Sequence, residues 1–281
     1  MRSLSLDEVV IGKFLGVLFL MKTIVNGFSF GVDGLSMEYY LLRCPSAELI
    51  VKTAVIQALE ADPKLAAGLG SDRSVLIDST KQNIAEKDSL GNLSLRGFEV
   101  IDKAKEQLEN VCPEIVSCAD ILAMAARAVF WAGGPLYDIP NGKMDGKRSK
   151  IENIIDLPAP FFNASQLINM FGHCGAHTLG MARCASYKKR LMHGADPDLD
   201  SVFAKTLFKT CSAGDTAEQP FDATRNTFDN LYYDALQRKA GVLSTDQTLY
   251  ASAETKRYVN GYAFNHAGFF FDFQQAMVKI E

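Results

Sequence analysis

The feature that most restricts the fold of this chain is the helical spacing of apolar residues between positions 45 and 62. In this stretch, PSAELIVKTAVIQALEAD, apolar side chains recur three or four positions apart, and Pro45 stands where a helix can start. The spacing predicts a helix over 45–62 with one buried face. The same pattern over 97–111 predicts a second helix of similar length.

A third helix is predicted over 117–131. Ser117 is a favourable N-cap, and Asp120, three residues later, completes a capping box with aspartate in the usual place of glutamate. Residues 133–160 are rich in Gly, Pro and short charged side chains, which predicts a long connection with a short hairpin, and a boundary between two lobes. We find no sustained strand alternation, and 212–220 is expected to be a surface loop. The fold class is therefore mainly α, with further helices predicted over 165–171, 198–211, 227–237 and 255–279.

Charge and composition restrict the partners. The 29 Lys and Arg residues face 33 Asp and Glu residues, a net charge of −4 with no basic stripe. This balance argues against a nucleic-acid binder that depends on phosphate neutralisation. A chain of 281 residues can bury one large core or form two lobes around a cleft. We therefore expect small molecules, and no nucleic acid, as partners.

The N-terminal region has the outline of a secretory signal. An apolar run, FLGVLFLM at 14–21, follows Arg2 and Lys13, and small residues come after it. We expect residues 1–31 to be a signal segment; a buried N-terminal helix is the alternative. Eight apolar residues cannot span a bilayer and no other run is long enough to do so, so no membrane span is expected. Six scattered cysteines without CxxC pairs agree with an oxidising compartment.

Residues 175–184, GAHTLGMARC, place one of only four histidines between small residues. An imidazole can ligate a metal through one ring nitrogen while the other donates to a carboxylate, and small neighbours allow a flat cofactor to approach. A buried, hydrogen-bonded core histidine is one alternative. A zinc site formed by His173, Cys174 and His177 is another, because the two histidines have helical i, i+4 spacing.

The segment GAHTLGMARC resembles the proximal haem-binding motif of the secretory plant peroxidases, the class III haem peroxidases. The likeness covers most of residues 35–279 and implies a two-lobed haem-peroxidase-like helical fold, shortened in the distal lobe. It implies a single domain over 32–281, with a distal lobe of about 32–155 and a proximal lobe of about 156–281. Other segments agree with the family in order: YYLLRCP at 39–45, SVLIDST at 74–80, AEKD at 85–88, NLSLRGFEVID at 92–102, CPEIVSCADILAMAAR at 112–127, DLPAPFF at 156–162, FDNLYY at 228–233 and STDQTLY at 244–250.

By this resemblance, haem b and calcium are the cofactors. His177 is the axial ligand of the haem iron, a ligation known for peroxidases, and Asp246 is the carboxylate behind its imidazole. For Asp246, the alternative is an N-cap of the following helix. The calcium ligands of the proximal lobe correspond to Thr178, Asp222, Thr224 and Asp229, with a backbone carbonyl near Thr227, and a plain polar turn is the alternative.

The resemblance assigns further residues. It implies disulfides between Cys44 and Cys112 and between Cys184 and Cys211. Cys118 resembles a position whose usual partner lies near the C-terminus of the family, and no cysteine follows Cys211 here, so free thiols are expected at Cys118 and Cys174. The remaining assignments are Asp72, Ser74 and Glu86 as the remnant of a distal calcium site, and Pro158 at the donor-access edge.

The chain departs from the family at 66–74, AAGLGSDRS. Family members carry here a helix with an arginine and a histidine, in the pattern R-x-H-F-H-D-C-F. The histidine moves the peroxide proton, which is typically worth roughly 10²–10⁴-fold, and the arginine stabilises negative charge. Both are missing, so no distal catalytic residue is assigned. Arg73 is a weak substitute, and Asn92 resembles the residue that orients the missing histidine.

The resemblance therefore implies a haem-dependent peroxidase that oxidises phenolic donors with hydrogen peroxide, as in peroxide removal under oxidative stress. We expect a monomer secreted to the extracellular space or the vacuole, with turnover slowed by the missing distal residues. The alternative is a catalytically silent haem-binding protein or a cofactor-free peroxidase remnant.

Overall fold

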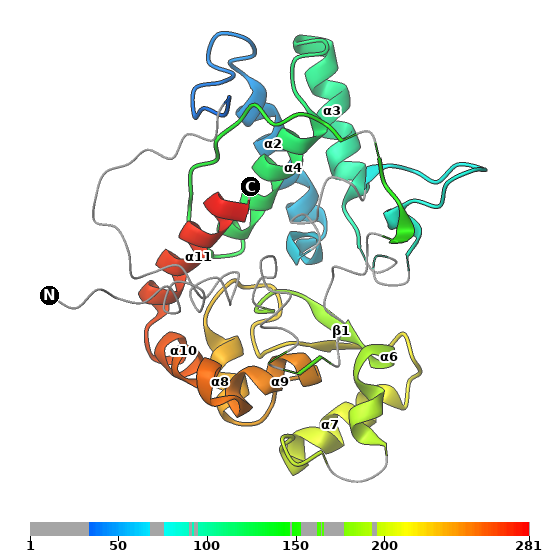
Figure 1. Ribbon diagram of the computed structural model, residues 1–281, viewed down its shortest axis with the longest axis vertical. Coiled ribbons are helices and arrows are strands. Elements are labelled where there is room, and N and C mark those ends of the chain that lie inside the picture. The colour runs from blue at the N-terminus through cyan, green and yellow to red at the C-terminus, as the bar shows by residue number, and fades with distance from the viewer. Residues whose placement is uncertain are drawn as a thin grey trace, which may run out of the picture. The chain divides into compact units, whose positions relative to one another are not determined.

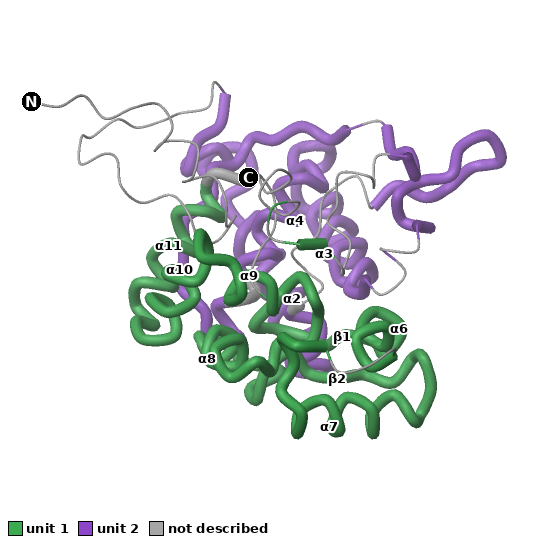
Figure 2. The backbone as a smooth tube through the Cα atoms, turned by 60° about the horizontal axis from the view of Figure 1, so that its bottom comes forward, with its two compact units in different colours: residues 1–23, 157–280 green, residues 24–156, 281 purple. Residues whose placement is uncertain are grey.

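A computed structural model gives the fold shown in Figure 1. It describes residues 34–67, 76–89, 92, 95–146, 148–152, 162–163, 165, 177–192 and 196–280. The chain divides between Asp156 and Leu157 into two compact units, coloured separately in Figure 2. The described residues 34–152 belong to one unit and 162–280 to the other. The expected signal segment, 1–31, lies outside the described residues.

Three packed helices form the core of the first unit: α2 (Ala47–Ala61), α3 (Phe98–Val111) and α4 (Cys118–Ala126). They confirm the helices predicted over 45–62 and 97–111, and the helix predicted over 117–131 as far as Ala126, after which the chain continues as a 3₁₀ helix. The buried residues of α2 and α3 pack in one core cluster, and α4 is buried from Ala119 to Ala126. Among its described residues, this unit also contains the 3₁₀ helices η2 (Pro63–Ala67), η4 (Glu86–Asp88) and η5 (Arg127–Phe130).

The N-terminus of α4 differs from the predicted capping box. Ser117 does cap the helix, because its Oγ accepts the N–H of Asp120 at 3.1 Å. The Asp120 carboxylate, however, is fully buried and accepts from Tyr40 Oη at 2.5 Å and from the N–H groups of Gly142 and Lys143 at 2.8 and 3.2 Å. A buried carboxylate needs several donors, so Asp120 joins three segments instead of closing its own helix turn.

The hairpin predicted within 133–160 is wrong for the described part of that range. Asn141 instead pairs with Ser36, with N–H···O distances of 2.9 and 3.0 Å. The neighbouring Gly142 has φ +115, and a Cβ there would lie 2.9 Å from the Gly34 carbonyl and the Tyr39 ring. The pairing partner is about a hundred residues away in sequence, so local spacing could not reveal it.

The second unit is also mainly helical, with one antiparallel ribbon. Strand β1 (Met181–Arg183) pairs with β2 (Glu218–Pro220), with Ala182 opposite Gln219. Three-residue strands are too short to show alternation. Strand β2 therefore lies at the end of 212–220, which was predicted to be a loop throughout. The helices are α6 (Cys184–Tyr187), η7 (Lys188–Leu191), α7 (Ser201–Cys211), α8 (Leu231–Gln237), α9 (Ser244–Ala251), α10 (Ala253–Phe264) and α11 (His266–Ile280).

The single helix predicted over 255–279 is wrong, because Asn265 separates α10 from α11. The Asn265 Oδ1 accepts the N–H of Gly268 at 2.9 Å, as an N-cap does. The predicted helices over 198–211 and 227–237 are confirmed in their C-terminal parts by α7 and α8. The helix predicted over 165–171 lies almost entirely outside the described residues.

The structure contains both disulfides that the resemblance implied. Cys44 before α2 is bonded to Cys112 after α3, and Cys184 is bonded to Cys211, which ties α6 to the end of α7. Cys118 is a free, partly buried thiol, and Cys174 lies outside the described residues. Within the described part of the chain, no helix has the length and apolar character needed to cross a membrane.

Candidate functional site

His177 and Asp246, 69 positions apart in the chain, are hydrogen-bonded in the second unit. The His177 Nδ1 lies 2.8 Å from Asp246 Oδ1. His177 directly precedes the segment that leads into β1, and Asp246 lies in the first turn of α9. The bond occupies Nδ1, which leaves Nε2 as the ring nitrogen for a metal.

The carboxylate of Asp246 is 3% exposed and held by two further donors. Tyr232 Oη donates to the same Oδ1 at 3.1 Å, and the N–H of Leu243 donates to Oδ2 at 3.3 Å. Asp246 is not the N-cap of α9, which was the expected alternative. It is the third residue of the helix, and its side chain accepts the N–H of the N-cap residue, Leu243. Asp246 therefore has its rotamer fixed independently of His177.

Two aromatic side chains fix the His177 ring. The Phe221 ring stacks on it with centroids 4.6 Å apart and planes 9° apart, and the Tyr232 ring meets it edge-on at 6.5 Å. The His177 side chain is still 44% exposed. The ring is thus held in one orientation while part of it remains accessible to a ligand.

Asp246 also sets the electrostatics of the pair. Burial lowers the pKa of His177, but the negative charge of Asp246 and the hydrogen bond to it outweigh burial, so the pKa lies above its ordinary value. Burial, together with the charge of Asp246, raises the pKa of Tyr232 well above its usual range. Tyr232 therefore stays a hydroxyl donor. An imidazole with a carboxylate on one nitrogen fits the axial ligand of a haem iron.

Beside His177, the predicted calcium ligands lie together. Thr178 is fully buried, and its Oγ1 lies 2.8 Å from the carbonyl oxygen of Asp229 and 3.1 Å from Asp222 Oδ2. Thr224 contributes its hydroxyl 3.2 Å from Asp222 Oδ1 and its N–H 2.8 Å from the same oxygen. Hydroxyl, carbonyl and carboxylate oxygens are the donors that calcium prefers.

The charge at this cluster agrees with a cation. Burial raises the pKa of Asp222, and the nearby charge of Asp229 raises it further, against hydrogen bonds that lower it. Two carboxylates in a partly buried turn repel each other, and a divalent cation between them would remove that repulsion. The residues present therefore fit calcium.

Fewer of the residues predicted for the distal side can be placed. Glu86 lies in η4; its N–H donates to Ser149 Oγ at 3.0 Å and its carbonyl accepts from Asn92 Nδ2 at 2.9 Å. Asn92 thus has a backbone partner. Asp72, Arg73, Ser74 and Pro158 lie outside the described residues, as do His173 and Cys174 of the zinc alternative.

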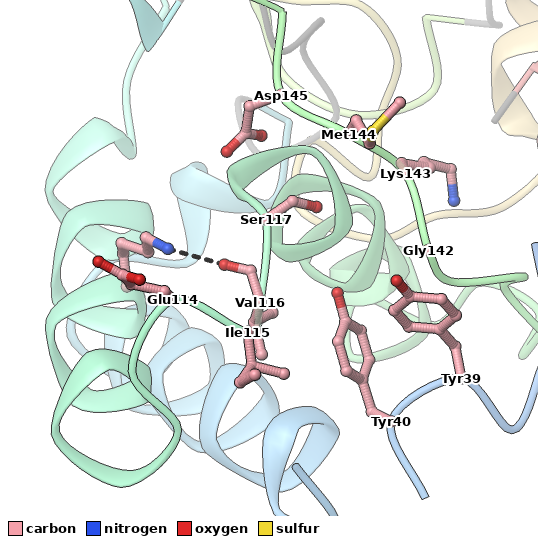
Figure 3. A pocket seen from close by; sticks show the side chains of 11 residues that line it. Tyr39, Tyr40, Glu114, Ile115, Val116, Ser117, Gly142, Lys143, Met144 and Asp145 are labelled. Atoms are coloured by element: carbon pink, nitrogen blue, oxygen red, sulfur yellow. Dashed lines mark hydrogen bonds between the residues drawn. The ribbon is translucent and has the colours of Figure 1, made fainter. Parts of the chain in front are cut away.

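The first unit has a polar cavity of about 240 Å³, shown in Figure 3. Both lysines in its wall have carboxylate partners: Lys105 with Glu109 at 2.5 Å and Lys143 with Asp120 at 3.7 Å. Asp145 already accepts the first two N–H groups of α4, at 3.1 and 2.9 Å. Lys105, Lys143 and Asp145 thus already have partners, and we assign the cavity no role.

Phe221 and Tyr232, which contact the pair, were not assigned from the sequence, and neither was Arg190, which binds the backbone before Leu243. Tyr232 lies in the family segment FDNLYY, and Phe221 directly precedes the predicted calcium ligand Asp222. Arg190 ends the run KKR at 188–190, which by composition resembles a solvated charged surface. Arg190 is 7% exposed, and two of its three acceptors, the carbonyls of Gly241 and Val242, lie about fifty positions further along the chain.

Comparison with known proteins decides the family. The family model described as Peroxidase matches residues 53–265. The chain is 60% identical over 297 aligned positions to Peroxidase 47 of Arabidopsis thaliana, covering 98% of this chain and 91% of that protein. The chain belongs to the class III plant peroxidases. Other relatives of this peroxidase are Peroxidase 64, 40% identical over 94% of this chain and 93% of the relative, and Peroxidase 66, 37% identical over 96% and 92%, both from Arabidopsis thaliana.

The family fixes the class of reaction. This peroxidase is an oxidoreductase that uses hydrogen peroxide with small-molecule donors, and it has the mainly helical fold of a family that binds haem and calcium. The alignment with Peroxidase 47 has 297 positions, more than the 281 residues of this peroxidase. Peroxidase 47 therefore has residues at positions where this chain has none.

Proposed function

We propose that this chain is a secreted haem peroxidase that holds the iron of haem b through Nε2 of His177 and oxidises phenolic donors. The observation that carries the proposal is the 2.8 Å contact between His177 Nδ1 and Asp246 Oδ1. It fixes the tautomer, raises the basicity of Nε2 and aims the ring. When bound, haem supplies the redox chemistry with hydrogen peroxide.

Calcium has a positioning role in this proposal. Thr178, Asp222, Thr224 and Asp229 would hold the cation, and Thr178 is the direct neighbour of His177. Because the backbone is continuous, a cation at Thr178 restrains the ring that ligates iron. Asp72, Ser74 and Glu86 are proposed as the remnant of the second calcium site.

The distal side determines the rate. The first 172 residues of the chain contain no histidine. Proton transfer at peroxide therefore lacks an imidazole from that part of the chain, and we expect a peroxide step slower by roughly 10²–10⁴-fold than with a distal histidine. Under this proposal 1–31 is the signal segment, 32–281 is one domain acting as a monomer, and Pro158 lines the approach of the donor.

Turnover of guaiacol with hydrogen peroxide tests the proposal. The purified, haem-supplied chain should oxidise guaiacol faster than free haem and more slowly than Peroxidase 47 of Arabidopsis thaliana. Substitution His177→Ala should remove the excess over free haem. Turnover of the unmodified chain equal to that of free haem would favour the catalytically silent alternative and reject the proposal.

A further inference from the structure

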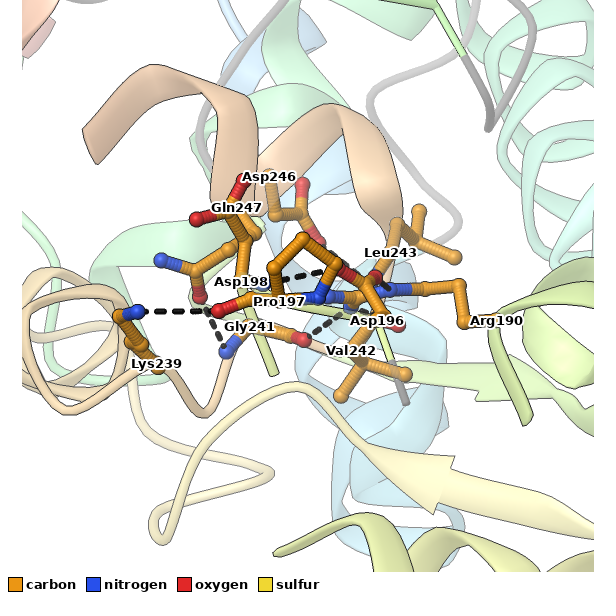
Figure 4. Close-up of polar contacts among 10 residues, drawn as sticks. All are labelled: Arg190, Asp196, Pro197, Asp198, Lys239, Gly241, Val242, Leu243, Asp246 and Gln247. Carbon is orange, nitrogen blue, oxygen red and sulfur yellow. Dashed lines mark hydrogen bonds and ion pairs between the residues drawn. The ribbon is translucent and has the colours of Figure 1, made fainter. Parts of the chain in front are cut away.

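Arg190 is a buried cation in the second unit, on η7, and the reaction proposed above does not use it directly. Its side chain is 4% exposed. As Figure 4 shows, it reaches three acceptors: Nε donates to Asp196 Oδ2 at 2.8 Å, and Nη1 donates to the carbonyls of Gly241 and Val242 at 2.5 and 2.9 Å. Nη2 is buried without a hydrogen-bond partner among the described residues, so the position of this buried cation depends on the contacts of Nε and Nη1.

Gln247 also binds the backbone segment 241–242 that Arg190 contacts. The N–H of Gly241 donates to Gln247 Oε1 at 3.0 Å, and Gln247 Nε2 donates to the Leu236 carbonyl at 2.9 Å. A Cβ on Gly241 would lie 2.8 Å from the Leu236 side chain and 3.0 Å from Gln247 Oε1. The Gly241 N–H and the carbonyls of Gly241 and Val242 are therefore all held by side chains, and there is little space for a Cβ at Gly241.

This backbone leads directly into the acidic partner of His177. Leu243 follows Val242, and its N–H donates to Asp246 Oδ2 at 3.3 Å. Asp246 Oδ1 in turn contacts His177 Nδ1 at 2.8 Å. A continuous series of contacts thus runs from the Arg190 guanidinium through the backbone of 241–243 to the imidazole.

We propose that Arg190 is a positioning residue that sets the geometry of the His177–Asp246 hydrogen bond through the backbone of residues 241–243. The planar guanidinium binds an acid and two carbonyls at once, in different directions. An ammonium group on the lysine stem cannot reproduce this fork. Arg190→Met removes all three contacts, and Arg190→Lys keeps the charge and part of the reach. The effect on bound iron rests on the function proposed above, whereas the effect on the hydrogen bond does not.

The first test uses the full chain without added haem. In ¹⁵N-histidine spectra, the hydrogen-bonded Nδ1 proton of His177 is assigned by its loss in His177→Ala, among only four histidines. Arg190→Met should abolish or shift this resonance, and Arg190→Lys should shift it less. The control Arg238→Met removes an arginine of the same unit whose side chain is 65% exposed and paired with Asp234, and should leave the resonance unchanged. A folded Arg190→Met with the wild-type resonance would overturn the proposal; if that variant does not fold, an unchanged resonance in Arg190→Lys would do so.

The second test uses the haem-supplied protein and measures the ferric/ferrous midpoint potential. Weakening the bond to Asp246 makes the imidazole a poorer donor, so the ferric form loses stability relative to the ferrous form. If Arg190→Met lowers the stability of the ferric form relative to the ferrous form tenfold, the midpoint potential rises by about 59 mV. Arg238→Met should leave the potential unchanged. An unchanged potential in a haem-loaded Arg190→Met contradicts the positioning role. Failure of the unmodified chain to bind haem contradicts the proposed function alone. The role of Arg190 is then still tested by the His177 resonance, which is measured without haem.

Discussion

At the scale of single residues, Asp246 connects the imidazole of His177 to the rest of the second unit. Its buried carboxylate accepts hydrogen bonds from His177, Tyr232 and the N–H of Leu243, so its negative charge is held against the imidazole. A carboxylate in this place increases the electron density of the imidazole, which stabilises oxidised iron.

Replacing this charge tests its contribution. Asp246→Asn keeps the size of the side chain and an oxygen acceptor but removes the negative charge. We expect peroxidase turnover to fall roughly 10- to 100-fold, the typical effect of changing such a partner of a metal ligand. Steady-state guaiacol kinetics measure this, with the exposed Asp234→Asn as the control. Equal rates in Asp246→Asn and the unmodified chain would show that the carboxylate does not act on the reaction.

Asp222 gives a prediction whose sign depends on calcium. Burial and the charge of Asp229 raise its pKa, so its ionised form is disfavoured without a cation. In EDTA, Asp222→Asn should therefore be at least as stable as the unmodified chain. With calcium at 100 times its dissociation constant, the unmodified chain should gain about 2.7 kcal/mol that the variant lacks. Thermal unfolding in both buffers measures this.

The control for that experiment is Asp215→Asn, because Asp215 is exposed and paired with Lys188 outside the cluster. It should respond to calcium like the unmodified chain. A calcium response in Asp222→Asn equal to that of the unmodified chain would place the cation elsewhere.

The sequence reveals individual site residues only where a motif or a family likeness carries them. His177 stands out because its neighbours are small, and Asp246 was assigned only by resemblance, since nothing local links positions 69 residues apart. Arg190 has no such signal: a run of three basic residues predicts exposure, and only the fold shows that the third is buried against the carbonyls of Gly241 and Val242.

At the scale of helices, apolar spacing predicts that a helix is present more reliably than it predicts where the helix begins and ends. The helices α2 and α3 match their predictions because their apolar stripes are long and regular. The pair α10 and α11 was predicted as one helix, because apolar spacing continues across Asn265. After the break at Asn265, Phe269 and Phe273 of α11 pack against Phe228. This contact joins residues about forty positions apart, so local sequence spacing could not predict it.

The break at Asn265 can be tested directly. Asn265→Ala removes the acceptor of the Gly268 N–H and should lower the free energy of unfolding by about 1 kcal/mol. Asn265→Asp keeps an acceptor at the same place and serves as the matched control. Urea unfolding measures both variants. An alanine variant as stable as the aspartate variant would mean that packing alone ends α10.

At the scale of the whole molecule, each unit carries its own disulfide. The Cys44–Cys112 bond spans 68 positions of the first unit and Cys184–Cys211 spans 27 of the second. Cross-links that close longer loops remove more entropy from the unfolded chain, although the size of the effect depends on the treatment of that state. Composition indicated an oxidising compartment, but only the family likeness supplied the pairing.

Removing each bond in turn should therefore destabilise the protein unequally. We expect a loss of about 4 kcal/mol for Cys44→Ala with Cys112→Ala, and slightly less for Cys184→Ala with Cys211→Ala. Guanidinium unfolding with separate probes of the two units measures the losses. A larger loss for the shorter loop would contradict the entropic account. Cys118→Ala, which removes the free thiol, is the control.

The central claim is that His177 binds the iron of haem, and the absorption spectrum of the haem-supplied full chain tests it most directly. We predict a Soret band typical of a histidine-ligated haem in the unmodified chain. The band should persist in His266→Ala, since His266 begins α11 and contacts Phe270, and it should be lost or replaced by that of free haem in His177→Ala. An unchanged Soret band in His177→Ala, or no haem uptake by the unmodified chain, would contradict the claim.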